Sequence, residues 1–343
     1  MRNLDLDNRE DGDEGGDEGG DDGAGAPAPT EPTAVLADTG DGAIEVIELA
    51  SGQRTRIEDA TGGRFSPDGR TIAFSRRTPA APLELVNRDG SDRRTIVDGI
   101  PAGMDSWTGI QPLGWSPTGD RIAGVDLEGR LVVVDVATGA ARATPAGVFA
   151  GEPSWSPYGD RLATWLGEQL SVIDAATGTV TALYTTPEYA FELAWSPDGS
   201  EIAFLEGVPA EKGPRLAAIS LTDRTIREIA GPAETRRDLL WSPAGDQLVW
   251  ALAGNLGGAI DSLFRVPADG SAPPSDLADV PEQPDTPIAW SPDGANLVFV
   301  TAPVREECCA ALWIVGADGS NLREVIGGLA LADYGTGFDV TFR

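Results

Sequence analysis

One five-residue pattern, an aromatic residue followed by Ser-Pro-x-Gly, occurs six times in this chain of 343 residues. Proline fixes φ at the second turn position, serine bonds to the local backbone, and glycine takes the positive φ that closes a tight reversal. The aromatic residues lie 50, 40, 40, 46 and 49 positions apart, which is the interval at which four-stranded propeller blades repeat. The six copies begin at Phe65, Trp115, Trp155, Trp195, Trp241 and Trp290.

Short β-type runs follow every copy of this turn. Residues 71–74 and 201–204 are examples, and runs of this length bounded by turn signals predict strands. A second hairpin follows each of these strands and also precedes the first turn, so that seven second hairpins accompany six turns. They span residues 44–57, 85–97, 131–144, 170–183, 216–229, 263–277 and 312–325.

The two ends of the chain supply the missing parts of one further blade. Residues 337–343 resemble a first strand, aligned on Phe338, with nothing after it, whereas residues 34–38 and 44–57 provide three strands with no first strand before them. Joining them closes the ring and leaves no unpaired radial edge. The sequence therefore predicts an all-β, single propeller of seven blades over residues 34–343, with six blades as the alternative if the terminal strand packs elsewhere.

The aromatic-Ser-Pro-x-Gly repeat with its following strand resembles the TolB-type, WD-repeat-like propeller repeat. That repeat is found in bacterial envelope proteins and in the non-catalytic propellers of prolyl oligopeptidase and dipeptidyl peptidase families. The resemblance covers nearly all of residues 34–343. It implies the fold but says little about function. We expect a non-enzymatic binding or scaffold protein of the cell envelope. The chain departs from TolB in having no recognisable α/β domain before the propeller.

Residues 1–33 differ in composition from the rest. They carry eleven acidic residues and two arginines among Gly, Ala and Pro, and we expect a disordered acidic tail. Of the net charge of −30, −9 belongs to this tail and −21 to the remainder, which argues against nucleic-acid binding. No apolar run is long enough to span a membrane. We expect an extracytoplasmic or envelope location if an export segment lies upstream of Met1, with the cytoplasm as the alternative, and a monomer is favoured.

Histidine is absent from the sequence, which excludes Ser-His-Asp and Cys-His catalysis and the usual zinc sites. There is no G-x-S-x-G elbow either. We therefore expect no enzymatic activity and no cofactor. The alternative is a propeller that uses carboxylates of its central channel to bind a metal or small molecule, or to catalyse a reaction on it.

Strand connectivity indicates where a partner would bind. The Ser-Pro-x-Gly turns and the second-hairpin turns should lie on one face, here called the turn face, and the longer connections on the other, the loop face. Mixed Arg and aromatic residues on the loop face suit a protein or peptide partner. The candidate residues are Arg76, Arg77, Trp107, Tyr189, Arg236 and Arg237.

Two smaller features are candidate sites. Glu152, Glu192 and Asp238 stand three positions before the aromatic residue in three consecutive blades. An all-oxygen cluster of this kind would suit Ca²⁺. Neutralisation of one carboxylate by the neighbouring Arg237 is the simpler interpretation.

Cys308 and Cys309 are the only cysteines, and being adjacent they could form a vicinal disulfide in an exported protein or stay as free thiols.

Overall fold

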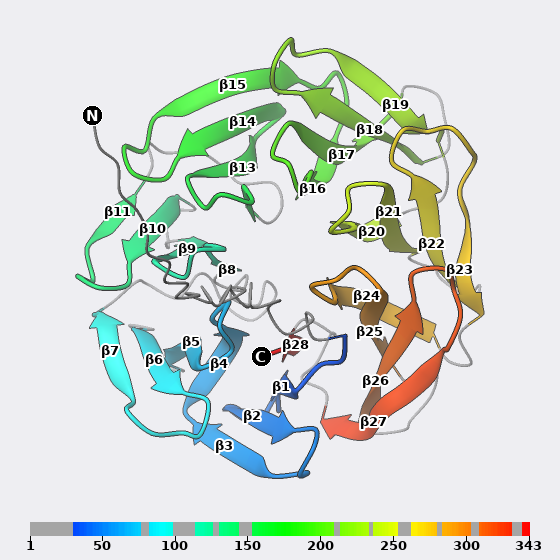
Figure 1. The fold of residues 1–343 in the computed structure, drawn as a ribbon. Coiled ribbons are helices and arrows are strands. Elements are labelled where there is room, and N and C mark those ends of the chain that lie inside the picture. Colours follow the sequence, from blue (N-terminus) through cyan, green and yellow to red (C-terminus); the bar gives the residue numbers. More distant parts are fainter. Residues whose placement is uncertain are drawn as a thin grey trace, which may run out of the picture.

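A computed structural model describes residues 30–76, 82–98, 114–125, 130–143, 153–208, 213–232, 236–252, 262–279, 283–302, 309–330 and 338–343. These residues form twenty-eight strands in seven antiparallel sheets of four. The sheets stand side by side around a central axis (Figure 1). The prediction of a seven-bladed, all-β propeller is confirmed, and the six-bladed alternative is excluded.

Blades 1 to 3 follow one another in sequence, each running from its inner to its outer strand. Blade 1 contains β4 (Ala60–Phe65), β5 (Thr71–Arg76), β6 (Leu83–Asn87) and β7 (Arg94–Val97). Blade 2 contains β8 (Gly114–Trp115), β9 (Arg121–Val125), β10 (Leu131–Asp135) and β11 (Ala141–Ala143). Blade 3 contains β12 (Ser154–Trp155), β13 (Arg161–Leu166), β14 (Gln169–Asp174) and β15 (Val180–Thr185).

Blades 4 to 6 repeat this order, and their inner strands are longer than those of blades 2 and 3. Blade 4 contains β16 (Ala190–Trp195), β17 (Glu201–Gly207), β18 (Pro214–Ser220) and β19 (Ile226–Ala230). Blade 5 contains β20 (Arg236–Trp241), β21 (Gln247–Leu252), β22 (Ser262–Pro267) and β23 (Ser275–Asp279). Blade 6 contains β24 (Gln283–Trp290), β25 (Asn296–Ala302), β26 (Cys309–Gly316) and β27 (Arg323–Ala330).

The seventh sheet, the closing blade, joins the two ends of the chain. Its strand order is β28 (Phe338–Thr341), β1 (Ala34–Asp38), β2 (Ala43–Glu48) and β3 (Arg54–Glu58). Figure 1 shows β28, in red, beside the blue β1 near the axis. The predicted closure by strands from both ends is therefore confirmed.

The register of β28 differs from the one that the sequence predicts. Val340 pairs with Val35, and Val35 holds the place in its blade that Ile72 holds opposite Phe65 in blade 1. Val340, and not Phe338, thus takes the position of the aromatic residue. A slip of two residues keeps every side chain on the same face of the sheet, so the hydrophobic pattern does not distinguish the two registers.

Seven hydrophobic clusters hold the ring together, one between each pair of neighbouring blades. The tryptophans of the turn motif contribute directly to this contact. The indole N–H of Trp115, Trp155, Trp195 and Trp241 donates to a backbone carbonyl of the preceding blade at 3.0–3.1 Å. Each residue therefore fills the space between two blades and also hydrogen-bonds across it.

The turns extend this inter-blade contact to the turn face. A Cβ built on Gly119 would lie 3.6 Å from Cδ of Pro67 in the preceding turn, and Gly245 and Gly294 meet Pro197 and Pro243 in the same way. The six turns therefore form a packed row around the axis, and at the closing blade Gly69 meets Thr341 instead of another such turn. Within the described residues, no helix has the length and apolar composition needed to cross a membrane.

Candidate functional site

The loop face presents one exposed aromatic side chain among the described residues, Tyr189, whose surface is 58% exposed. It lies in the connection between β15 and β16. Its ring stacks on Phe191, with 6.0 Å between centroids and 12° between planes. Its underside rests on Gly207, where a Cβ would come within 2.6 Å of Cε1. We call Tyr189, Phe191 and Gly207 the aromatic ledge.

A polar network fixes the strands beside the ledge. The Glu206 side chain, at the end of β17, is 2% exposed and accepts hydrogen bonds from Tyr184 Oη at 2.6 Å and from Arg215 Nη2 at 2.6 Å and Nε at 2.9 Å. Burial and the neighbouring Glu206 raise the pKa of Tyr184 to about 12. Burial opposes ionisation of Glu206, but the hydrogen bonds from Tyr184 and Arg215 outweigh it and lower its pKa. At neutral pH the network is therefore a phenol, a carboxylate and a guanidinium.

The other predicted partner-binding residues are spread over several settings. Arg76, whose side chain is 41% exposed, forms an ion pair with the buried Glu84, which also binds Arg93 at 2.7 Å. Arg236 and Arg237 open β20, a strand where the sequence predicts a loop. Arg77 and Trp107 lie outside the described residues.

The predicted acidic row coincides with a backbone irregularity. Glu192 and Asp238 have φ of 51° and 57°, and each lies in a β-bulge of its inner strand. Gly62, at the same position of blade 1, has φ of 65° and lies in the corresponding bulge. Aspartate and glycine are common where φ is positive. Among the described residues, no three Asp, Glu or Cys residues are grouped so that they could hold a metal ion. Glu152 lies outside the described residues. The calcium site stays a prediction.

Cys309, the first residue of β26, is disulfide-bonded in the structure. Cys308, the one other cysteine of the chain, lies outside the described residues. The redox state of the pair in solution stays a prediction.

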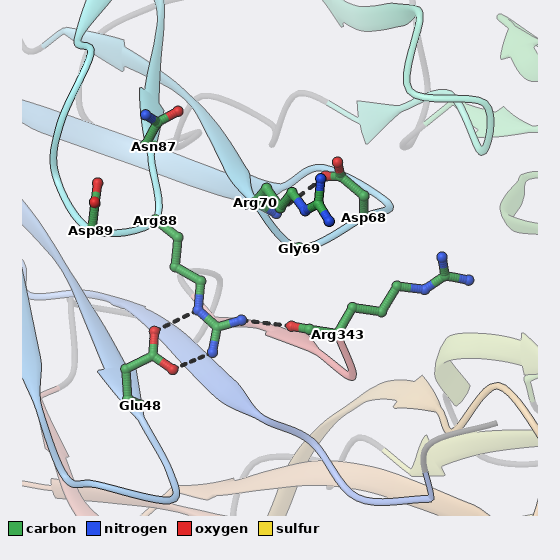
Figure 2. A pocket seen from close by; sticks show the side chains of 8 residues that line it. All are labelled: Glu48, Asp68, Gly69, Arg70, Asn87, Arg88, Asp89 and Arg343. Carbon is green, nitrogen blue, oxygen red and sulfur yellow. Dashed lines mark hydrogen bonds and ion pairs between the residues drawn. The ribbon is translucent and has the colours of Figure 1, made fainter. Parts of the chain in front are cut away.

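A pocket that the sequence analysis did not anticipate lies on the turn face, between the closing blade and blade 1. We call it the seam pocket; it measures about 650 Å³. It is lined by Glu48, Asp68, Gly69, Arg70, Asn87, Arg88, Asp89 and Arg343 (Figure 2).

Arg88 forms the wall of the seam pocket. Its Nε lies 2.5 Å from Glu48 Oε1, its Nη2 binds the second carboxylate oxygen, and its Nη1 donates to the Arg343 carbonyl at 2.6 Å. The Arg88 amide donates to Arg70 O, and the same backbone hydrogen bond identifies the equivalent position in the other six blades. That position is occupied by Leu49, Val136, Ala175, Leu221, Ala268 and Ala317. An arginine at a position that is otherwise apolar was the sequence signal that could have revealed this site.

Comparisons with known proteins agree on the fold. The family model for eukaryotic translation initiation factor eIF2A matches residues 169–325, which is less than half of the chain. None of the curated proteins matches. The structure resembles TolB from Acinetobacter baumannii (17% identity, TM-score 0.50, 90% of this chain and 82% of that one). It also resembles oligogalacturonate lyase from Vibrio parahaemolyticus (14%, 0.59, 84% and 83%) and Kuenenia stuttgartiensis hydrazine synthase (16%, 0.53, 74% and 77%). Such identities establish a shared β-propeller, which hosts unrelated functions.

Proposed function

We propose that this protein is a non-catalytic β-propeller that binds a protein or peptide partner through its loop face, with Tyr189 as the anchor. The observation that carries the proposal is an exposed aromatic ring held in one position. Tyrosine is enriched at the energetic centres of interfaces because it provides a large contact area with few rotatable bonds. The cell-envelope setting suggested by the repeat resemblance is part of this proposal.

The surroundings of Tyr189 support an anchor role. Phe191 and Gly207 fix the ring, and the Glu206 network holds the ends of β15, β17 and β18 next to it. Rotamer freedom has thus already been lost before a partner binds. A side chain ordered in advance costs less entropy on association, which raises affinity without further contacts.

The test uses a photo-crosslinking phenylalanine analogue at position 189. Tyr158 is the matched control, because it is 60% exposed but lies in a Ser-Pro-x-Gly turn on the opposite face. We expect a covalent adduct with one partner from position 189 and none from position 158. Adducts from position 158 alone, or equal adducts from both, would contradict the proposal.

Purified partner then allows a quantitative test. Tyr189→Ala should weaken binding at least tenfold, about 1.4 kcal/mol, as expected for the loss of an interface anchor. Gly207→Ala keeps the tyrosine but forces its ring to move, so it should weaken binding as well. Tyr158→Ala should leave the affinity unchanged. Unaltered affinity in Tyr189→Ala would refute the anchor role.

A further inference from the structure

Blade 3 has a polar side chain at a position where most blades have an aromatic one. The position lies two residues beyond the one that pairs with the aromatic residue of the turn motif. It holds Phe74, Phe204, Trp250 and Phe299 in blades 1, 4, 5 and 6. Each of these rings is buried and belongs to the hydrophobic cluster shared with the preceding blade. In blade 3 the same position holds Thr164.

The two remaining blades have small apolar residues at this position. They are Gly124 in blade 2 and Ala37 in the closing blade. Thr164 is therefore the one polar residue in the series of seven.

Ser171 lies directly across from Thr164 on the neighbouring strand. Thr164 of β13 and Ser171 of β14 are partners in the register. Successive side chains of a strand point to opposite faces, and Leu162 and Ile173, two residues away on the two strands, pack against blade 2. Both hydroxyl-bearing side chains thus point into the contact between blades 2 and 3. The Cβ atoms of such a pair are about 4.5–5.5 Å apart, so the two hydroxyls are neighbours.

Neither hydroxyl has a hydrogen-bond partner in the part of the chain that the structure describes. Both residues are 0% exposed, and Thr164 Oγ1 and Ser171 Oγ are buried without a bond. The blade 2 side chains in this contact are Ala123, Leu131 and Val133, which are apolar and cannot accept or donate one.

This situation is confined to one place in the protein. Among the described residues, these are the only two buried hydroxyl groups that lack a partner. Elsewhere a partner is supplied: Ser156 Oγ donates to Asp160 Oδ1 at 2.7 Å, and Thr186 Oγ1 accepts the Glu188 amide at 3.2 Å. A buried hydroxyl without a partner is unfavourable, because the hydrogen bonds that it makes to water in the unfolded chain are lost on folding.

We infer that an ordered water molecule is bound between blades 2 and 3 and bridges Thr164 Oγ1 and Ser171 Oγ. Buried waters occupy sites where polar groups would otherwise be unpaired. A hydroxyl has one donor and two acceptor sites, so a single water can accept from one of these groups and donate to the other. Complete burial of both residues favours a molecule as small as water over a larger solute.

Trp165 belongs to a different contact. Its indole N–H is also buried without a partner in the described residues, but its side chain lies in the cluster shared with blade 4, on the other face of β13. The water site therefore consists of Thr164 and Ser171.

A crystal structure at a resolution that shows ordered solvent tests the inference directly. We expect one water within hydrogen-bonding distance, about 2.5–3.0 Å, of both hydroxyl oxygens. It should be absent from the variant Thr164→Val/Ser171→Ala. A parent structure without this water, or with the two hydroxyls bonded directly to each other, would overturn the inference.

The sign of a stability change gives an independent test in solution. Thr164→Val keeps the shape of the side chain and removes only its hydrogen-bonding capacity. If the hydroxyl binds water, the thermal midpoint should fall by about 1–2 °C, whereas removal of an unpaired hydroxyl should raise it. Thr186→Val is the matched control, because Thr186 is also buried but has a partner in the protein, and its midpoint should fall in either case. A midpoint of Thr164→Val that rises or stays unchanged would overturn the inference.

A double-mutant cycle then shows whether the two hydroxyls share one molecule. Ser171→Ala should also lower the midpoint. The double variant should lose less unfolding free energy than the sum of the two single variants, because the first substitution already removes the bridge. Additive losses would contradict a shared water.

Discussion

Arg88 Nη1 lies 2.6 Å from the carbonyl oxygen of Arg343, so a side chain of blade 1 holds the strand that closes the ring. The same guanidinium binds both oxygens of Glu48 in the closing blade. One side chain therefore links three segments that are far apart in sequence. Its side chain is 18% exposed, which limits the screening of these interactions by solvent.

Arg88→Ala should lower the free energy of unfolding by about 2 kcal/mol, because it removes charge-assisted hydrogen bonds and leaves Glu48 without its partner. Arg56 is the control: it binds Asp41 and Glu58, but with a side chain 39% exposed beside acids that are more than 60% exposed. Arg56→Ala should have little effect. Chemical denaturation measures both, and equal losses would show that Arg88 does not hold the closure.

The tryptophans allow a matched test of inter-blade hydrogen bonding. Trp241 Nε1 donates to Ala194 O at 3.0 Å, whereas Trp290 Nε1 is buried and has no partner in the described part of the chain. Both Trp→Phe changes remove similar volume, but only Trp241→Phe removes a hydrogen bond. We expect Trp241→Phe to cost about 1 kcal/mol more in unfolding free energy than Trp290→Phe. The reverse order would show that these hydrogen bonds contribute nothing.

Turn glycines allow a comparison of strain with crowding. Gly52 and Gly139 both have φ of 70°, but a Cβ at Gly52 meets nothing within 4 Å, whereas one at Gly139 lies 2.5 Å from the Ile96 carbonyl of the preceding blade. Gly52→Ala should cost about 1 kcal/mol from the positive φ alone. Gly139→Ala should cost roughly 2 kcal/mol more because the blades must move apart. Equal thermal midpoints for the two variants would contradict this.

Asp339 should produce a pH dependence of its own. Its carboxylate, in β28, accepts the Phe65 amide at 2.7 Å and the Val340 amide at 2.9 Å. Burial raises the pKa of Asp339, although Arg64 and the two amides oppose the shift. A raised pKa in the folded state means that the stabilising contribution of Asp339 is complete below about pH 4 and is lost as the pH rises through the folded value.

The turn aspartates, such as Asp198, have lowered pKa values, so their stabilising contribution is lost as the pH falls. The variant Asp339→Asn isolates the opposite effect of Asp339, because the turn aspartates are the same in both proteins. We expect the unfolding free energy of Asp339→Asn, relative to the parent protein, to increase between pH 4 and pH 7. Urea denaturation at several pH values measures it. A difference that is constant or that decreases over this range would show that the Asp339 pKa is not raised.

Calcium binding by the acidic row is tested by calorimetry on chelator-treated protein. If Glu152, Glu192 and Asp238 hold Ca²⁺, millimolar calcium should raise the thermal midpoint by mass action, and Glu192→Gln should abolish the rise. Magnesium serves as the control, since it prefers a smaller octahedral site. An unchanged midpoint with calcium would assign these residues to the bulge alone.

The predictable part of this fold is the part encoded locally. Each turn specifies its own hairpin through Pro and Gly, and the apolar runs beside it form strands whatever the rest of the chain does, so seven blades and their closure follow from spacing. The register of β28 does not follow, because Val340 and Phe338 point to the same face and the choice depends on pairing with β1.

The site residues show the same division. The exposure of Tyr189 could be predicted, because it lies in a connection between blades and such connections run over the surface; its role in binding stays a prediction. The Glu206 network and the contact from Arg88 to Arg343 could not, because they join residues that only the closed ring brings together. The positive φ of Glu192 and Asp238 was also hidden, since a bulge changes the backbone without interrupting the apolar pattern.

Because strands from both ends of the chain share the closing blade, the same ring of blades can be built by a chain that begins at a different strand. Thr33 N lies 2.7 Å from Thr341 O, so a short linker could join the ends and a new opening could be cut at another turn, for instance after Pro197. Such a circular permutant should keep all seven blades and their packing. In this permutant, blade 4 would lack the turn between β16 and β17, and the linker would fill the cavity beside Arg88. The seam pocket is in this sense a property of where the chain is opened.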